Sequence, residues 1–292
     1  MKILLLGSNG MLGQSVSRYF AALDKFELYT AARTGADFNF DFTNFEMLEE
    51  CFAGIRPDIC INAAAIVSLD DCEKNVGVAY SVNAALCSNL ADLCARYHTY
   101  YIQISTDHYY SGDGRRKHTE KDAIHLYNEY ARTKYAGECF AGLYENALVL
   151  RTNIVGFRGD AKRPTFVEWA LNTLHSKQKM RLFNDFFTSS ISTILFVKIL
   201  RDVINANLTG LYNLASATVS SKEEFILNLS QQVLNYVPEY DSVSVAEGLH
   251  TRRAESLGLG TSKIEQALGY PMPQVDEVVY SIAKEYKELY AL

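Results

Sequence analysis

Short runs of apolar residues alternate with longer segments of helical period along the first half of the chain. Runs of this kind are typical of parallel strands that are buried on both faces. They are found at Ile3–Leu6, Phe26–Ala31, Asp58–Ala63, Tyr100–Ser105 and Ala147–Thr152. Helical patterns lie between them, over residues 11–23, 43–52, 76–97 and 126–144. This alternation predicts an α/β fold of Rossmann type, with a doubly wound parallel sheet covered by helices on both faces.

The alternation loosens after about residue 155. Further helices are predicted over 165–174, 191–204, 262–268 and 275–289, and further strands over 179–183 and 210–214. We therefore predict a first domain over 1–160 and a smaller α/β lobe over 161–292, with a segment near 185–215 returning to the first domain.

Polar residues mark two of the expected helix starts. Thr43 with Glu46, and Ser221 with Glu224, have the spacing of a capping box, so a helix is predicted to begin after Thr43 and after Ser221. Trp169 lies on an amphipathic helix, where we expect it to be part of the core.

The composition is that of an ordinary globular protein. Of the 292 residues, 48% are hydrophobic and 21% are charged, which excludes disorder, collagen and coiled coil as overall descriptions. The 28 Lys and Arg against 34 Asp and Glu give a net charge of −6. This balance disfavours nucleic acid as a partner, because phosphate contacts need clustered basic residues.

Cysteine usage and the start of the chain indicate the compartment. The six cysteines lie in the first half, without a Cys-x-x-Cys pair or a Cys/His cluster at zinc spacing, so we predict free thiols and no metal site. The apolar run Ile3–Leu6 is shorter than the roughly 7–15 residues of a signal-peptide core. No apolar run of about 18 residues predicts a membrane span. A cytoplasmic protein without a membrane partner is the expectation.

A glycine-rich turn follows the first predicted strand and opens the first predicted helix. Glycines at 7, 10 and 13 suit a dinucleotide-binding turn, in which the pyrophosphate approaches the backbone and the helix N-terminus. The candidate cofactor residues here are Gly7, Asn9, Gly10, Met11, Leu12 and Gly13. An ordinary left-handed turn is the alternative interpretation.

The end of the second predicted strand bears on the choice of cofactor. NAD-binding folds usually place an acidic residue here for the ribose 2′-hydroxyl, whereas this chain has Arg33, which could meet a 2′-phosphate. We therefore expect NADPH, with NADH as the alternative if Arg33 is only a solvated charge. Asp41 and Phe42 suit contact with the adenine, or mark a turn.

Tyr130 and Lys134 are spaced to lie one turn apart on a helix face. A phenol has a reference pKa of about 10, and a nearby ammonium lowers it, so the pair is a sensible proton donor. The spacing alone is not specific, because the chain has 19 tyrosines and a second such pair, Tyr280 and Lys284, that we interpret as surface. Tyr130 differs because it follows a strand that ends near Thr106. Thr106 is the candidate for binding a substrate carbonyl, and Ser105 competes with it.

Together these motifs resemble an extended short-chain dehydrogenase/reductase, and within it the dTDP-4-dehydrorhamnose reductase family. The resemblance runs nearly end to end. It is carried by residues 7–13, 62–65, 81–84, 104–107, 130–138, 150–152, 184–185, 210–215 and 261–263, and by Asp70, Asp71, Glu73, Gly112 and Phe225.

The resemblance implies an NAD(P)H-dependent reduction of a nucleotide-linked 4-keto-6-deoxy sugar, for deoxysugar and surface polysaccharide biosynthesis. Thr106, Tyr130 and Lys134 would be the catalytic residues, and Tyr130 and Lys134 would also contact the cofactor. Residues Asn62, Ala63, Ala64 and Ala65 would line the cofactor groove. The 1–160 domain would then bind the dinucleotide and the 161–292 lobe mainly the substrate. The family also makes a homodimer possible.

Substrate contacts are implied at Ser105, His108, Asn153 and Arg253, with Arg252 or Arg253 on the diphosphate. His108 could bind a sugar hydroxyl, act as a second acid, or only pack. The run Arg115–Lys117 is either a solvated loop or a diphosphate contact, and residues 186–189 lie where the family builds a substrate-side wall.

The departures from the family pattern fall where substrate identity is decided. His108 replaces a usual Tyr, Ile154 a frequent Trp, and Gly260 a common Asp, and the usual Pro before the catalytic Tyr is missing. These changes leave the expected chemistry intact, and they allow a different deoxy-keto sugar or a different nucleotide.

Two other functions remain open at this point. One is a nucleotide-sugar epimerase or dehydratase of the same superfamily, which retains tightly bound NAD. The other is a non-catalytic, NADP-binding regulatory subunit that resembles the beta subunit of methionine adenosyltransferase. The intact Tyr130–Lys134 pair weighs against the second.

Overall fold

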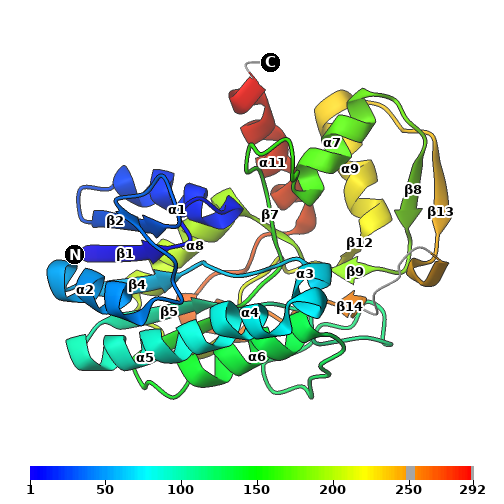
Figure 1. Ribbon diagram of the computed structural model, residues 1–292. Coiled ribbons are helices and arrows are strands. Elements are labelled where there is room, and N and C mark those ends of the chain that lie inside the picture. The colour runs from blue at the N-terminus through cyan, green and yellow to red at the C-terminus, as the bar shows by residue number, and fades with distance from the viewer. Residues whose placement is uncertain (248–253, 291–292) are drawn as a thin grey trace. The chain divides into compact units, whose positions relative to one another are not determined.

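A computed structural model describes residues 1–247 and 254–290, and its centre is a seven-stranded sheet (Figure 1). The strand order is β11-β6-β5-β4-β1-β2-β3. The strands are β1 (Lys2–Leu6), β2 (Glu27–Ala32), β3 (Phe38–Asn39), β4 (Ile59–Asn62), β5 (Tyr100–Ile104), β6 (Ala147–Arg151) and β11 (Gly210–Asn213). β1 pairs in parallel with β2 on one side and with β4 on the other. From β1 to β3 each new strand is added on one side of β1, and from β4 onward the strands are added on its other side. Doubly wound folds bind their ligands between the two neighbouring strands where this change occurs, here β1 and β4.

The central strands form because they are apolar on both faces. Leu4 and Leu6 face a cluster that includes Phe52, Leu90 and Tyr101, all buried. Ile3 and Leu5, which alternate with them, are fully buried as well. Because successive side chains of a strand point to opposite faces, only a strand covered on both sides explains this pattern. The predicted Rossmann-type α/β fold is confirmed.

Helices on both faces supply that cover. α1 (Met11–Ala21) lies on one face, and α2 (Phe45–Ile55), α5 (Leu86–Tyr97) and α6 (Glu129–Ala141) contribute to the cluster on the other (Figure 1). α3 (Leu69–Lys74), α4 (Val76–Tyr80) and a π-helical turn, Ser81–Ala85, precede α5. The single long helix expected over 76–97 thus contains a π turn. Nothing in its hydrophobic period marks this turn.

The first of the two predicted capping boxes is wrong. α2 begins after Asn44, whose side chain accepts a hydrogen bond from Met47 N, whereas Thr43 donates from its backbone and its hydroxyl to Asp41. Asn and Thr both suit an N-cap, so the carboxylate two residues earlier decided between them. The second box is confirmed, since Ser221 and Glu224 cap α9 (Lys222–Leu234) reciprocally.

The chain divides into two compact units. The first contains residues 1–106, 126–151 and 207–212, and the second contains 107–125, 152–206 and 213–292. The segment 107–125, which we assigned to the first domain, therefore belongs to the second unit, and the piece that returns to the first unit is short. The predicted domains were mostly continuous stretches of the chain. The two units of the structure are instead groups of segments that pack together.

The second unit is built from several helices and small sheets. Its helices are α7 (Phe166–His175), α8 (Thr193–Asn205), α9, α10 (Ser262–Leu268) and α11 (Val275–Tyr290). Its short strands pair as β8 (Met180–Phe183) with β13 (Tyr240–Val243), β7 (Ile154–Val155) with β10 (Ile191–Ser192), and β9 (Phe187–Thr188) with β12 (Ser220–Ser221) and β14 (Ser256–Leu257). A core from α7, α9 and α11 includes Leu171, Phe225 and Ile282. Trp169 is not in this core, since 43% of it is exposed, so that expectation is wrong.

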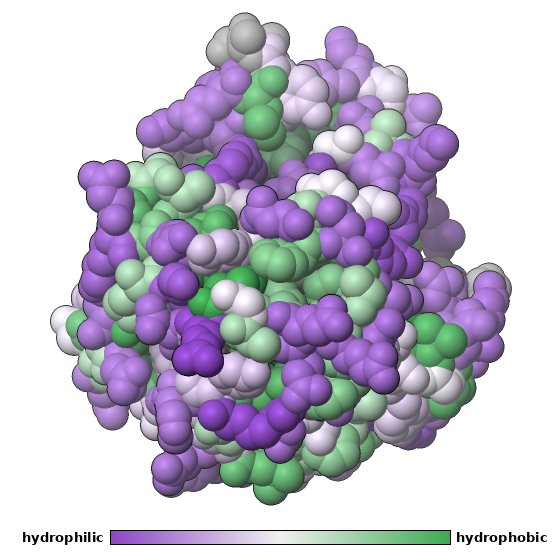
Figure 2. Space-filling view, turned by 60° about the vertical axis from the view of Figure 1, so that its left-hand side comes forward, coloured by the Kyte–Doolittle hydropathy of each residue, from purple (hydrophilic) through white to green (hydrophobic). Residues whose placement is uncertain are grey.

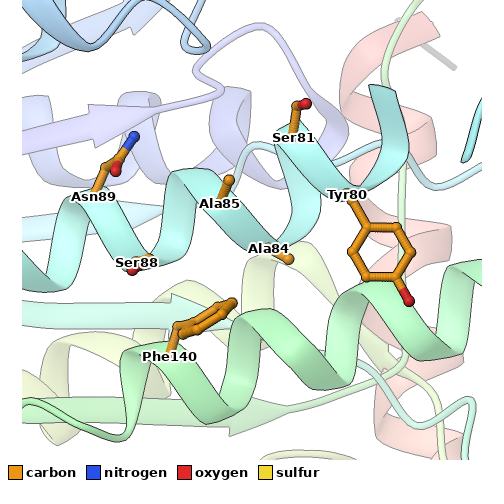
Figure 3. A pocket seen from close by; sticks show the side chains of 7 residues that line it. All are labelled: Tyr80, Ser81, Ala84, Ala85, Ser88, Asn89 and Phe140. Atoms are coloured by element: carbon orange, nitrogen blue, oxygen red, sulfur yellow. The ribbon is translucent and has the colours of Figure 1, made fainter. Parts of the chain in front are cut away.

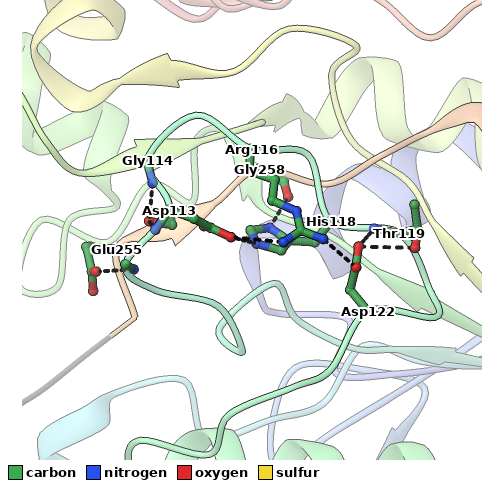
Figure 4. Close-up of polar contacts among 10 residues, drawn as sticks. Asp113, Gly114, Arg116, His118, Thr119, Asp122, Glu255 and Gly258 are labelled. Carbon is green, nitrogen blue, oxygen red and sulfur yellow. Dashed lines mark hydrogen bonds and ion pairs between the residues drawn. The ribbon is translucent and has the colours of Figure 1, made fainter.

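The segment 107–125 is held to the second unit by a buried histidine (Figure 4). His118 Nδ1 donates to Gly258 O over 2.9 Å, and its Nε2 lies 3.0 Å from Asp113 Oδ2. The His118 ring stacks on Tyr110 with 3.9 Å between ring centroids. A Cβ on Gly258 would lie 2.4 Å from Arg116 O, so only glycine allows this approach. These contacts explain why the segment packs with residues far along the chain.

The six cysteines are free thiols, as predicted, and five of them are buried. On the face shown in Figure 2, hydrophilic residues surround small, scattered groups of apolar ones. Among residues 1–247 and 254–290, no helix combines the length and the apolar character that a membrane crossing requires. In the same residues, no group of three or more His, Cys, Asp and Glu is placed to hold a metal ion.

Candidate active site

The glycine turn between β1 and α1 is a close-packed backbone cradle. Gly7 has a φ of +80°, and a Cβ there would lie 2.7 Å from Ala64 N. A Cβ on Gly13 would lie 2.1 Å from Gly7 O. Gly10 is the N-cap of α1, no side chain caps the helix, and its first turn has no acidic residue. The N-terminal N–H groups and the positive end of the helix dipole are therefore not neutralised by the helix itself, which suits a phosphate.

Asn62, at the end of β4, positions the opposite wall of this cradle. Its buried side chain accepts from Ala64 N over 3.1 Å and donates to Gln103 Oε1 over 2.8 Å. Asn62 therefore holds the backbone that touches Gly7. The partly exposed side chains of Ala63, Ala64 and Ala65 are small and leave space beside the turn.

The loops after β2 and β3 surround the other side of the turn. Asn9 donates to Thr34 O, next to the exposed Arg33. Hydrogen bonds from Thr43 hold the pKa of Asp41 below its usual value, with a smaller contribution from Arg33. Phe42 is buried and packs edge-on against Phe40. Asp41 thus forms a turn and Phe42 a core contact, and their contact with the adenine stays a prediction.

One face of α6 contains three ionisable residues at intervals of four. Tyr130, Lys134 and Glu138 are 8%, 4% and 7% exposed. The N-cap Asn128 accepts from Ala131 N over 2.8 Å, and Glu73 accepts from Glu129 N over 2.8 Å, so the turn that holds Tyr130 is fixed from two sides. Tyr130 packs with Cys72 and Ala79, next to Ile66 and Leu69.

Lys134 links this helix to the end of β5. Its Nζ donates to Ile104 O over 2.7 Å, two residues before Thr106. Burial lowers the pKa of Lys134, while Cys87 and Glu138 act in the opposite direction. An ammonium has three N–H donors, and one of them is used here. Thr106 is buried, with 3% exposure, in the same unit as Tyr130.

Ser105 is engaged by a buried ion pair. Its hydroxyl donates to Glu138 Oε2 over 2.9 Å, and Arg151 Nε donates to both Glu138 oxygens over 3.1 Å. Arg151 ends β6, so the network joins the ends of two strands to α6. The Ser105 hydroxyl hydrogen is thus committed to Glu138, and the assignment of Thr106 to the substrate carbonyl stays a prediction.

The π turn brings a second buried asparagine against α6. Asn83 accepts from Ile66 N over 2.8 Å and donates to Thr133 Oγ1 over 3.1 Å. A Cβ on Gly137 would lie 2.1 Å from Asn83 O, so α6 packs directly on the backbone of this turn. π turns are frequent at functional sites, and this one helps to fix the helix of Tyr130.

A surface groove in the first unit lies apart from this chemistry. It is lined by Tyr80, Ser81, Ala84, Ala85, Ser88, Asn89 and Phe140 (Figure 3). None of the residues that the sequence assigned to catalysis or to the cofactor lines it. The second Tyr–Lys pair, Tyr280 and Lys284, is on α11 in the second unit and is exposed at the surface.

Two of the substrate residues predicted from the resemblance, His108 and Asn153, lie beside Asp107 in the second unit, whereas Ser105 lies in the first. Asn153 donates to Asp107 Oδ2 over 2.7 Å and accepts from Ser190 Oγ over 2.7 Å. His108 Nε2 lies 4.0 Å from Asp107 Oδ1. Arg252 and Arg253 lie outside the described residues. Asp107 follows Thr106 directly, so this polar cluster begins one residue from the expected catalytic threonine.

Known proteins share both the sequence pattern and this architecture. The family model for the RmlD substrate binding domain matches residues 1–288. The chain belongs to the RmlD family. Its similarity to the dTDP-4-dehydrorhamnose reductase of Escherichia coli strain K12 is 28% identity over 290 residues, 94% of each chain.

Solved structures show the fold of this RmlD-family chain. A dTDP-4-dehydrorhamnose reductase from Clostridium acetobutylicum superposes with a TM-score of 0.88 at 22% identity, covering 98% of this chain and 100% of the other. The enzyme of that name from Bacillus anthracis, solved in complex with NADP, gives a TM-score of 0.85 at 23% identity, covering 97% and 98%.

Sequence reasoning missed several polar residues of this RmlD-family chain. Asn83, Asp107, Glu138 and Arg151 stood inside matched motifs without an assigned role, and Ser190 and Lys222 were not singled out. Buried Asn, Glu and Arg in apolar surroundings need partners, so the polar positions within predicted buried elements were an available signal.

Proposed function

We propose that this protein is an NAD(P)H-dependent reductase of a nucleotide-linked 4-keto-6-deoxy sugar, active in deoxysugar and surface polysaccharide biosynthesis. Membership of the RmlD family supports the class of reaction. The observation that carries the proposal is the buried face of α6, where Tyr130 and Lys134 stand together and Lys134 is bound to the strand end that leads to Thr106.

The first unit fits a dinucleotide. The cradle at Gly7 and Gly13 leaves no room for a Cβ, and the N-terminus of α1 offers uncapped N–H groups to a pyrophosphate. Asn9, Gly10, Met11 and Leu12 complete the turn, and Ala63 to Ala65 face it. Arg33 is exposed beside the turn, which favours NADPH over NADH. When bound, NADPH supplies the hydride that reduces the sugar carbonyl.

The residues of the chain polarise the carbonyl and deliver a proton. Thr106 donates to the carbonyl oxygen, and Tyr130 transfers its phenolic proton to that oxygen as negative charge develops on it. The ammonium of Lys134, one turn along the same helix, stabilises the resulting phenolate. Its bond to Ile104 O fixes the direction of the side chain, and its other donors suit the hydroxyls of the cofactor ribose.

The second unit is the substrate lobe in this proposal, and the first unit is the dinucleotide lobe. His108 and Asn153 contact the sugar, Ser105 supports this edge through Glu138, and Arg253 contacts the diphosphate. The protein works in the cytoplasm. A homodimer remains a prediction of the resemblance, and light scattering during gel filtration tests it.

The test is to incubate the protein with dTDP-4-keto-6-deoxy sugars and to follow NADPH absorbance. Oxidation of NADPH with one stereoisomer of the alcohol as product is expected. Absence of oxidation with every keto sugar offered would sink the proposal. Tightly bound NAD and an epimerised or dehydrated product would indicate the other enzymes of the superfamily. Copurification with a larger partner, without turnover, would indicate a regulatory subunit.

A further inference from the structure

Lys222 places an ammonium group between two aromatic rings. It is the first residue of α9 and is partly buried. Its Nζ lies 4.4 Å from the ring centroid of Phe166 and 5.7 Å from that of Phe186. Within residues 1–247 and 254–290, no oxygen accepts a hydrogen bond from Nζ and no carboxylate pairs with it. The rings stabilise the cation and fix its position, but they satisfy none of its three N–H donors.

The neighbouring basic side chains differ from Lys222 in this respect. Arg115 pairs with Glu224 over 2.6 Å, Arg116 pairs with Asp122 over 2.7 Å, and Lys117 donates to Ala217 O over 2.7 Å. The run Arg115–Lys117 is thus used in internal contacts, and its contact with a diphosphate stays a prediction. Lys222 keeps its hydrogen-bonding capacity for another partner.

Lys222 is within electrostatic reach of Asp107, which forms a polar cluster with Asn153 and His108. Burial lowers the pKa of Lys222 to about 8, while the carboxylate of Asp107 acts in the opposite direction. Asp107 is itself bound by Asn153 and follows Thr106 in the chain. A partly dehydrated ammonium gains most from a partner that carries negative charge, because attraction is strong where water is scarce.

We propose that Lys222 binds an anionic oxygen group of the nucleotide-sugar substrate and so contributes to substrate selection. The proposal rests on the proposed function, because it assumes that the Asp107 cluster faces the substrate. The diphosphate of such a substrate has this chemistry. A carboxylate on the sugar ring has it too, but it belongs to a uronic acid and not to a 6-deoxy sugar, so binding there would contradict the proposed substrate.

Calorimetric binding to the full chain distinguishes these sources. The ligands are thymidine, dTDP, dTDP-glucose and dTDP-glucuronate, and the variants are Lys222→Met, Lys222→Arg and the control Lys198→Met, an exposed lysine on α8. If Lys222 meets the diphosphate, Lys222→Met weakens dTDP binding by about tenfold or more and leaves thymidine within twofold. If it meets a sugar carboxylate, the loss is confined to dTDP-glucuronate. Lys222→Arg retains most of the affinity in both cases, and Lys198→Met changes nothing.

A pH series on the wild-type chain gives a reading that does not depend on how Lys222→Met folds. Affinity for the anionic ligand falls between pH 7 and pH 9, as the ammonium loses its proton, and Lys222→Arg removes that part of the fall. The other charged groups on neighbouring elements are Asp107, Glu168 on α7, Asp185 beside Phe186, and the Arg115–Glu224 pair. Glu168 accepts from the backbone N–H groups of Arg158, Gly159 and Thr165, and Asp185 accepts from Ser244 and from Val245 N, so both have their own partners.

Three results would overturn the assignment. They are affinities that stay within twofold in Lys222→Met for every ligand, an equal loss for thymidine, and a pH dependence that Lys222→Arg retains. Lys222-dependent dTDP binding without any reductase activity would support this inference and contradict the proposed function, so the two can fail separately.

Discussion

Two helices of this protein contain the same Tyr-x-x-x-Lys-x-x-x-Glu pattern in opposite environments. On α6, Tyr130, Lys134 and Glu138 are all less than 9% exposed. On α11, Tyr280 is 66% exposed, and the side chains of Lys284 and Glu288 are 67% and 63% exposed, with 3.9 Å between them. The local sequence geometry is the same, so what differs is the set of groups that surround each helix face.

That difference is why we propose the α6 pattern, and not the α11 pattern, as the catalytic one. Lys134 is bound to Ile104 O, and Glu138 is bound to Arg151 and Ser105, so each side chain has a fixed direction. On α11 the same groups extend into solvent, where water screens the charge of Lys284 and its effect on Tyr280 is small. The neighbours of each helix face, and not the motif alone, therefore distinguish the proposed catalytic pattern from the exposed one.

The largest expected effect separates the two tyrosines. Tyr130→Phe should lower kcat by about 10²–10⁴-fold, because it removes the proton donor, and should leave cofactor affinity within about twofold. Tyr280→Phe should leave kcat unchanged. Steady-state kinetics on both variants check this, and comparable losses in the two would contradict the assignment.

The glutamates should differ in stability. Glu138→Ala leaves Arg151 buried without its carboxylate and should cost about 3–5 kcal/mol of unfolding free energy. Glu288→Ala removes an exposed group and should stay within about 0.5 kcal/mol of wild type. Urea titrations give both values. A loss below about 1 kcal/mol in Glu138→Ala would show that the network is not a structural anchor.

Two helical glycines extend the comparison to the cofactor cradle. Gly13→Ala forces a Cβ against Gly7 O and should cost about 1–3 kcal/mol of stability together with most NADPH affinity. Gly77→Ala, in α4, meets no heavy atom within 4 Å and should be neutral or slightly stabilising. Fluorescence titration with NADPH and thermal melting test the pair. Equal behaviour would contradict a backbone cradle at Gly13.

The smallest effect concerns the two adjacent hydroxyls. Ser105→Ala removes one hydrogen bond to Glu138 and should cost about 1 kcal/mol of stability, with kcat changed less than in Thr106→Val. Thr106→Val should lower kcat and keep the fold. A larger kcat loss in Ser105→Ala would reverse the roles that we give to these residues.

The predictable part of the fold is the part that local periodicity encodes. Apolar runs predicted the central strands to within a residue or two, as with β4 at Ile59–Asn62 for a predicted 58–63. The start of α2 was missed, because Thr43 is drawn to Asp41 and Asn44 caps the helix instead. The π turn at Ser81–Ala85 was missed as well, since it depends on the contact between Asn83 and α6.

The candidate site was predictable where chemistry and spacing coincide. The glycine turn and the Tyr130–Lys134 pair are short segments whose function needs particular residues at particular intervals. Other contacts join positions that are far apart in the chain. They are the ion pair of Arg151 with Glu138, the hydrogen bond of Asn153 to Asp107, and the contacts of Lys222 with Phe166 and Phe186. No local pattern reports such partners.

The sequence by itself determined the class of fold, and it predicted the position of the dinucleotide turn and the identity of the acid–base pair. Backbone sterics, strand burial and helix periodicity act over a few residues, and a single sequence records them. Only the tertiary structure decided which of two identical patterns is buried, which hydroxyl donates to Glu138, and which lysine lies between two aromatic rings. Burial and pairing are properties of neighbours in space, and they arise only when distant segments pack together.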